Sequence, residues 1–233
     1  MPVMNLLALE TSTESGTCAL WLNGRLLERA CPAGRPHSET LLPLVRELLA
    51  EAGVGFAGLD GIAFGCGPGA FTGLRIAFGI AQGLAVAAAL PVLPVVGLAA
   101  MAETSGAAQV LALLDARMNE VYCARYRRGP DGLPVLDGAI RVAAPVDIDL
   151  PGEPGWAACG NAAAAYPALA DRLRGAGIPL RGDILPGASA VARIGAAALA
   201  RGEGIDPALA APLYVRDKVA RTVAERLREG GRA

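Results

Sequence analysis

The residues best suited to chemistry lie in two turns, each of which follows a predicted strand. The first turn, ETSTES, begins with the carboxylate of Glu10 and continues with the hydroxyls of Thr11, Ser12 and Thr13. The second turn, DARMNE, begins with the carboxylate of Asp115. Hydroxyls and turn amides bind phosphate, and a carboxylate beside them can hold a metal ion or move a proton. The hydroxyls of the first turn could therefore meet a phosphate, and Glu10 and Asp115 could form an acid pair, with solvated turn carboxylates as the favoured alternative.

The second turn fits a phosphate clamp poorly. Arg117 and Met118 stand where small residues would let backbone amides approach a ligand, so half of the clamp is missing. Glu10 also carries its carboxylate one methylene further out than an aspartate would, which matters for Mg²⁺ because this ion demands strict octahedral distances. Hydroxyl-rich turns that satisfy their own backbone remain the alternative for Glu10, Thr11, Ser12, Thr13 and Asp115.

A glycine-rich segment, GCGPGAFTGLRIAFGIAQGLA from Gly65 to Ala85, joins a short apolar strand to a long helix without acidic residues. Its glycines permit positive φ and close approach, and Thr72 is predicted to cap the helix, with free amides aimed outward. A nucleotide loop is disfavoured, because the Gly-x-x-x-x-Gly-Lys pattern is absent and Lys218 is the only lysine. The order of elements favours a ligand or partner site over a simple connector.

Other catalytic groups are scarce. His37 is the only histidine, and it stands with Glu39 at a helix start, where a contact or capping role is more common than metal binding. The serines therefore have no second histidine as a base. Five scattered cysteines without a C-x-x-C spacing predict reduced thiols and a cytoplasmic protein. A net charge of −1 with 18% charged residues excludes a chain that grips nucleic acid alone.

The hydrophobic pattern predicts an α/β protein with two similar halves. In the first half, three strands, a helix, a strand, a helix and a strand follow one another, and Asn23-Gly24 predicts a hairpin. The expected ranges are Met4 to Leu9, Gly16 to Leu22, Arg25 to Cys31, His37 to about Ala52, Leu59 to Gly65, Thr72 to Ala89 and Val92 to Val96.

The order then restarts. Strands are expected at Gln109 to Ala116, Asn119 to Arg127 and Leu136 to Ala143, and helices at Ala162 to Arg174 and Ala188 to Arg201, with a loop from Pro145 to Pro154. Residues 206 to 216 should be extended, and a last helix should run from Lys218 to Arg228. We therefore expect subdomains at 1–100 and 101–205 and a terminal segment at 206–233. A repeated unit of this kind is the plan of the actin, hexokinase and Hsp70 class, in which the two halves face a cleft.

The stretch from Ile76 to Ala102 has no charged residue and is long enough to span a bilayer. Gly79, Gly83, Pro91, Pro94 and Gly97 interrupt it. A core helix followed by a core strand is therefore preferred, and no membrane association is expected.

Two helices carry more apolar surface than one core-facing stripe requires. The first presents Leu41, Leu44, Val45 and Leu48, with Leu42 and Leu49 widening the arc. The second carries Phe71, Leu74 and Phe78 among small residues. We expect a partner to cover them, so that a charge at Leu41 and Leu48, or at Phe78, abolishes association and leaves the monomer folded. Enclosure of both helices within the monomer is the alternative.

Five segments, LALETST, HSETLLPLVRELL, LDGIAFGCGPGAFTGLRIAFGIAQGLA, LLDARMNEVYCARY and PLYVRD, occur in an order and spacing that resembles the TsaB (YeaZ) family of the bacterial machinery for threonylcarbamoyladenosine in tRNA. The resemblance covers most of the chain but not residues 130–154, and Glu10 departs from the usual aspartate.

The resemblance implies an actin-like fold without its own catalysis, metal or cofactor, with ATP or ADP only within a complex. It implies a subunit that dimerises with the catalytic TsaD subunit, is joined by the ATPase TsaE, also self-associates, and meets tRNA only through the complex. Together with the helix faces it places the partner interface at His37, Ser38, Leu41, Leu44, Val45, Leu48, Phe71, Thr72, Leu74, Arg75 and Phe78.

Three points bear on this expectation, two of them alternative functions and one a feature of the sequence. An active actin-fold ATPase or small-molecule kinase would turn over nucleotide alone, and a plain homodimeric scaffold would have no link to tRNA. The basic tail is the third feature, since residues 216–233 carry six basic and three acidic side chains. Such a run is usually a solvated helix face, so tight tRNA binding by the isolated chain is not expected.

Overall fold

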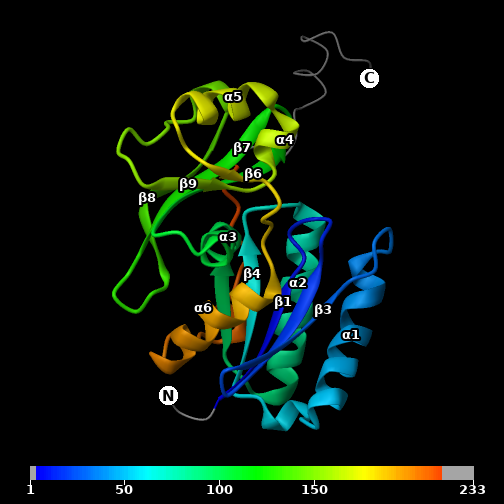
Figure 1. Ribbon diagram of the computed structural model, residues 1–233. Helices are drawn as coiled ribbons and strands as arrows, with labels where there is room; N and C mark the ends of the chain where they lie inside the picture. The colour runs from blue at the N-terminus through cyan, green and yellow to red at the C-terminus, as the bar shows by residue number, and fades with distance from the viewer. Residues whose placement is uncertain (1–3, 217–233) are drawn as a thin grey trace.

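The computed structural model describes residues 4–216 and shows two five-stranded sheets stacked one above the other (Figure 1). The first sheet has the strand order β3-β2-β1-β4-β5, in which β1 is antiparallel to β2 and parallel to β4. Asn23 and Gly24 both have positive φ, which confirms the predicted two-residue hairpin turn. The strands are β1 (Asn5–Glu10), β2 (Thr17–Leu22), β3 (Arg25–Ala30), β4 (Gly61–Gly67) and β5 (Val92–Val96).

Helices cover both faces of the first sheet. Leu7 and Leu9 of β1 face α1 (His37–Ala52) and α2 (Phe71–Ala88), whereas Leu6 and Ala8 face α6 (Ala188–Ala200) on the other side. Because α6 packs on the first sheet, the first half takes one of its layers from a stretch that the sequence assigned to the 101–205 subdomain.

The second sheet has the order β10-β9-β6-β7-β8, with β6 and β9 parallel as β1 and β4 are. The duplicated α/β, actin-like fold class is therefore confirmed. The elements are β6 (Gln109–Arg117), β7 (Glu120–Arg128), β8 (Pro134–Ala143), β9 (Trp156–Cys159), β10 (Leu180–Arg181), α4 (Ala162–Ala165) and α5 (Pro167–Gly175). Three short 3₁₀ helices complete the described chain, η1 (Phe56–Gly58), η2 (Pro145–Asp147) and η3 (Pro207–Leu209).

The second half departs from the predicted pattern in two places. The strands β9 and β10 were not predicted, because they have four and two residues and no clear alternation. The helix expected from Ala162 to Arg174 is two helices, because Pro167 starts a new helix after Tyr166 leaves the helical conformation. Between β8 and β9 the described chain has only η2 where the first half has α1.

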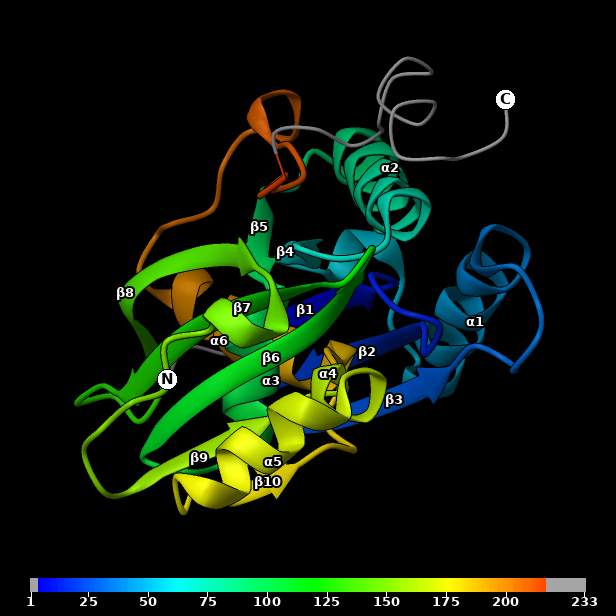
Figure 2. The same ribbon diagram turned by 90° about the horizontal axis from the view of Figure 1, so that it is seen from above.

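The chain passes between the halves at α3 (Gly97–Ser105), between β10 and α6, and in the last described residues. Helix α3 packs against β6 through Leu98 and Met101. Residues 206–216, which we call the strap, follow an antiparallel bridge between Ile205 and Val92 and run alongside α2 to the second half (Figure 2). The predicted helix from Lys218 to Arg228, with most of the basic tail, lies outside the described residues.

The uncharged stretch from Ile76 to Ala102 is not one helix. It comprises most of α2 and the strand β5, as the preferred interpretation expected, and part of α3, a helix that the sequence analysis did not predict. By length and composition alone α2 could still cross a membrane, a test that core helices of soluble proteins also pass.

Candidate functional site

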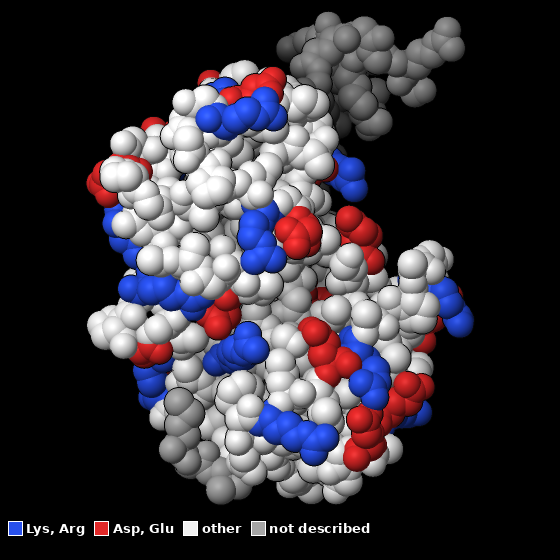
Figure 3. Space-filling model, viewed as in Figure 1, with Lys and Arg blue, Asp and Glu red and all other residues white. Residues whose placement is uncertain are grey.

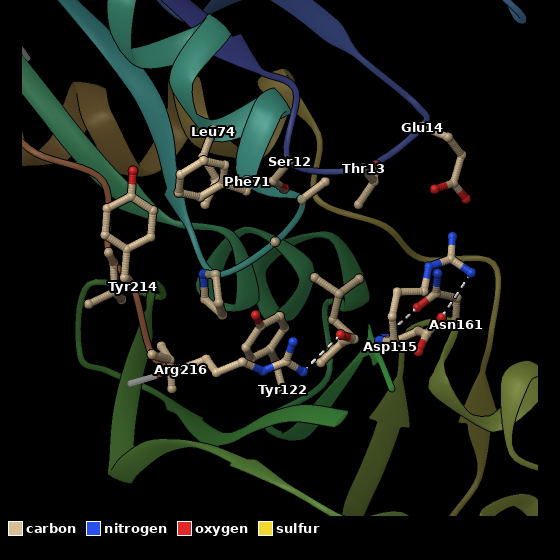
Figure 4. A pocket seen from close by; sticks show the side chains of 18 residues that line it. Ser12, Thr13, Glu14, Phe71, Leu74, Asp115, Tyr122, Asn161, Tyr214 and Arg216 are labelled. Carbon is tan, nitrogen blue, oxygen red and sulfur yellow. Dashed lines mark hydrogen bonds and ion pairs between the residues drawn. The ribbon is translucent and has the colours of Figure 1, made fainter. Parts of the chain in front are cut away.

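A cleft with a cavity of about 250 Å³ lies between the two halves (Figure 4). Six parts of the chain line it: the first turn, the start of α2, the end of β6, the strand β7, the residue before α4 and the strap. On one wall stand Ser12, Thr13 and Glu14, and across from them stand Asp115 and Asn161. The remaining lining residues are Pro68, Gly69, Ala70, Phe71, Leu74, Leu114, Ala116, Arg117, Tyr122, Leu213, Tyr214, Val215 and Arg216.

The start of α2 is seated on the first turn. The Ala70 amide donates a 2.7 Å hydrogen bond to the Ser12 carbonyl, and the Thr11 hydroxyl donates one of 2.7 Å to the Gly73 carbonyl. A Cβ atom at Gly73 would lie 1.8 Å from the Thr11 carbonyl oxygen. Gly69 and Gly73 therefore allow close packing of backbone on backbone.

The predicted N-cap at Thr72 is wrong. Helix α2 begins at Phe71 with Ala70 in the cap position and no side-chain cap, and Thr72 is an exposed residue of the first turn of the helix. The capping rule failed because the turn already supplies the backbone contacts that position this end of the helix.

Glu10 is enclosed by the protein and does not line the cleft. Its Oε1 accepts a 2.6 Å bond from the Ser12 amide, while its Oε2 has no partner and lies 1.8 Å from where a Gly65 Cβ would stand. Burial raises the pKa of the Glu10 carboxyl, an effect opposed by the Ser12 bonds and by nearby His37. Burial also raises the pKa of the neighbouring Cys66 thiol to about 12. Glu10 therefore forms no acid pair with Asp115 across the cleft, and it is not the solvated turn carboxylate of the alternative interpretation.

His37 joins the start of α1 to the first turn. Its Nε2 lies 2.9 Å from the Thr13 carbonyl oxygen, and its ring lies against Gly16, where a Cβ would come within 2.6 Å of the ring. This is a structural contact. Within residues 4–216, no group of three or more His, Cys, Asp or Glu side chains is arranged to hold a metal ion.

The second turn is built differently from the first. The Asp115 carboxylate accepts bonds from the Tyr166 hydroxyl (2.9 Å) and the Arg117 amide (2.8 Å), and the Asn161 side-chain oxygen accepts a bond from the Asp115 amide (2.9 Å). Arg117, Met118 and Asn119 all have positive φ. Sequence reasoning missed Tyr166 and Asn161, which come from the far end of the second half and carry no motif.

Several residues predicted to meet a partner are core residues of the monomer. Leu41, Val45, Leu48 and Leu74 are at most 2% exposed, because the arc of α1 that looked too wide is covered by the first sheet and by α2. A charge at Leu41 or Leu48 would enter this core, so the expectation that such variants stay folded is wrong. The other predicted residues stay at least partly accessible: His37, Ser38, Leu44, Phe71, Thr72, Arg75 and Phe78.

The solvent side of α2 carries a ridge of residues spaced by four. Phe71, Arg75, Gly79 and Gly83 are all exposed, and Cβ atoms added at the two glycines would meet nothing within 4 Å. Val86 extends the same side and is 66% exposed. Residues spaced by four form the ridges with which helices pack against one another. This side of α2 therefore presents an exposed ridge of the kind that packs against helices in proteins.

Comparisons with known proteins agree on one family. Residues 32–170 match the family model described as TsaD, tRNA N6-adenosine threonylcarbamoyltransferase. The chain is 37% identical over 230 residues to the Escherichia coli tRNA threonylcarbamoyladenosine biosynthesis protein TsaB. This match covers 93% of this chain and 96% of that protein. It is 46% identical over 132 residues to the Haemophilus influenzae protein of the same name, covering 55% of this chain and 56% of that one.

A solved structure supports the same assignment. YeaZ from Pseudomonas aeruginosa superposes with a TM-score of 0.81 and 40% identity, over 91% of this chain and 99% of that one.

Proposed function

The chain belongs to the TsaB family of tRNA threonylcarbamoyladenosine biosynthesis proteins, and we propose that it is a non-catalytic subunit of the threonylcarbamoyl transferase of the cytoplasm. In this role it dimerises with a catalytic TsaD subunit, supports binding of the ATPase TsaE, and so enables transfer of the threonylcarbamoyl group to the adenosine beside the anticodon. Any contact with tRNA is made by the complex.

The main support for the non-catalytic role is the first turn, whose polar groups are hydrogen-bonded within the protein. In this turn the Glu10 carboxylate is enclosed against Gly65 and accepts a bond from the Ser12 amide, while the Ser12 carbonyl and the Thr11 hydroxyl are bonded to the start of α2. In the second turn Asp115 is held by Tyr166 and Arg117. A ligand in the cleft would therefore meet the Asp115 carboxylate, which is already hydrogen-bonded, and the exposed Glu14, but not Glu10.

The ridge on α2 supports the partner role. The family model that matches residues 32–170 is that of the TsaD transferase, and the matched range includes both α1 and α2. A TsaD subunit therefore has counterparts of these two helices. Two related helix pairs can pack about a pseudo-twofold axis, as identical surfaces do in a symmetric dimer. The exposed Gly79 and Gly83 would let the facing helix approach closely.

The charge distribution supports an indirect contact with tRNA. On the face shown in Figure 3, basic and acidic side chains are interspersed over both halves. Many of the described arginines are paired with carboxylates, including Arg29 with Glu51, Arg127 with Asp137 and Arg128 with Glu103. Tight binding to RNA needs several unpaired cations on one surface.

Reconstitution tests the proposed function. Purified chain would be assayed alone and with a TsaD subunit, TsaE and the synthase that makes the threonylcarbamoyl adenylate, with incorporation of labelled threonine into tRNA as the readout. We expect none from the chain alone, incorporation from the full set, and loss of it when this chain is omitted. ATP turnover by the isolated chain that disappears in Asp115→Ala would instead favour the ATPase or kinase alternative.

A binding experiment tests the ridge. The double variant Gly79→Gln and Gly83→Gln adds side chains only into open space, so it should stay folded and should bind TsaD at least about 100-fold more weakly, because the facing helix can no longer approach. Ala168→Gln, on an exposed position of α5 in the second half, is the matched control and should bind normally. Normal binding by the double variant would place the interface elsewhere.

A further inference from the structure

We propose that the strap supplies a third part of the partner surface, beside α1 and α2, and that Tyr214, Phe71 and Arg75 together receive an acidic side chain of the TsaD subunit. This inference rests on the proposed function. The family resemblance and the helix patterns gave the strap no role, although PLYVRD is among the matching segments.

The strap is held along the length of α2. Near its beginning, the Gln82 side-chain amide donates a 2.8 Å hydrogen bond to the Pro207 carbonyl. Near its end, the Leu213 amide donates one of 2.7 Å to the carbonyl of Cys66, at the end of β4. The strap therefore forms part of the same face of the molecule as the solvent side of α2.

The last residues of the strap alternate between different surroundings. Leu213 packs on the core of the first half, and Val215 packs on the core between α3 and the second sheet. Arg216 donates to the Ala116 carbonyl at 3.0 Å and pairs with Glu120. Tyr214, between these anchors, lies against the first turn of α2 and is 46% exposed. Its position is fixed by its neighbours and not by its own burial.

Tyr214, Phe71 and Arg75 form a compact cluster, which we call the aromatic platform. The rings of Tyr214 and Phe71 lie 5.6 Å apart, and the Arg75 guanidinium carbon lies 3.8 Å from the centre of the Phe71 ring. The Arg75 Nε also donates to the Tyr214 hydroxyl at 3.4 Å. Phe71 and Arg75 begin the ridge that continues with Gly79 and Gly83, so the platform is continuous with the proposed helix contact.

The charge of the platform indicates the chemistry of its partner. Within residues 4–216, Arg75 forms no ion pair with a carboxylate, and α2 carries no acidic residue. Aromatic residues and arginine are the side chains that contribute most to binding at protein interfaces. A carboxylate opposite Arg75, with apolar atoms against the two rings, would satisfy the charge and cover the exposed aromatic surface.

A TsaD subunit fits this requirement better than a second copy of the chain. In a twofold contact between two copies, both α2 helices would offer the same single cation and no acidic group. A different chain can place a carboxylate where this chain has Arg75 or a glycine. The platform therefore favours the heterodimer over the homodimer.

Calorimetric titration of the full chain with the TsaD subunit tests the inference. We expect Tyr214→Ala and Arg75→Gln each to weaken binding at least about tenfold, and Arg75→Gln to reduce the salt dependence of the affinity. Leu209→Ala is the matched control, because Leu209 is on the same strap and is 77% exposed. It should bind as the wild type does. Thermal melting would confirm that each variant is folded.

The outcomes separate this inference from the proposed function. If the glycine double variant loses binding and the two platform variants do not, the strap inference is overturned and the proposed function stands. If none of the variants changes binding, both the strap inference and the ridge fail. If the platform variants weaken only self-association of the isolated chain, the occupant is a second copy and the inference is overturned.

Discussion

The turns that open the two halves hold equivalent places in the duplicated topology, but the first is buried and the second is exposed. In the first turn, residues 10 to 13 are at most 8% exposed, and the long helix α2 is seated on them through Gly69 and Gly73. In the second turn the side chain of Arg117 is 80% exposed and Met118 is 53% exposed. After β9 comes the four-residue helix α4, which leaves this turn uncovered. Both turns line the cleft, but only the first also positions a long helix.

The strongest test of this contrast changes the glycine contact beneath α2. Gly73→Ala places a methyl group against the Thr11 backbone, so we expect a loss of about 3 kcal/mol or more in the free energy of unfolding, or no folded protein. Gly79→Ala, in the same helix, meets no atom and should gain up to about 1 kcal/mol. Urea unfolding followed by circular dichroism measures both. Equal stability of the two variants would mean that α2 is not seated on the turn.

A second test uses the buried carboxyl of the first turn. Because the folded-state pKa of Glu10 is raised above 4.5, its contribution to stability is complete below that pH and is lost as pH rises through the folded pKa. Each pH unit between the two pKa values costs the wild type about 1.4 kcal/mol. Glu10→Gln cannot ionise, so its stability relative to the wild type should increase from pH 5 upward.

The control for this experiment is Glu14→Gln, which removes an exposed carboxylate from the same turn. Its stability should follow that of the wild type across the same range. His37 and Cys66, which face Glu10, are present in all three proteins. Parallel pH profiles for wild type and Glu10→Gln would show that Glu10 is accessible to water in solution.

The smallest expected effect concerns the exposed second turn. Met118 has φ 54°, a conformation that costs a residue with a Cβ roughly 1 kcal/mol and costs glycine little. Met118→Gly should therefore be about 1 kcal/mol more stable than Met118→Ala, which keeps the Cβ atom. Thermal unfolding of the pair measures the difference. A less stable glycine variant would indicate that the turn relaxes to another conformation when its side chain is removed.

Local patterns were sufficient for much of the fold. The Asn23-Gly24 hairpin, the start of α1 at His37 and the strand that ends in the glycine-rich segment all follow from the order of residues over short windows. The contacts that define the site are long-range. Thr11 meets Gly73 across 62 positions, and the Ala188 amide donates to the Thr17 hydroxyl across 171 positions. No periodicity within a single segment contains such information.

The partner surface was also only partly predictable from local sequence patterns. The apolar arc of α1 was recognised, but its extent alone could not show that the first sheet and α2 cover Leu41 and Leu48. The ridge of α2 was partly predicted, since Phe71 and Arg75 were named and the small residues were noted. The role of Tyr214 depends on the strap returning to α2 from the other end of the chain, which only the three-dimensional arrangement shows.

Helix α6 has a consequence for the way the chain emerges from the ribosome. All five strands of the first sheet have been synthesised once residue 96 has been added. The face formed by Leu6, Ala8 and Ala63 is covered only later, by Val191 and Ala192 of α6. Domains generally fold in order during synthesis, and unprotected apolar surface invites aggregation. About half of the chain must still be translated while this face is uncovered, so the nascent protein presents a natural substrate for chaperones until α6 has left the ribosome.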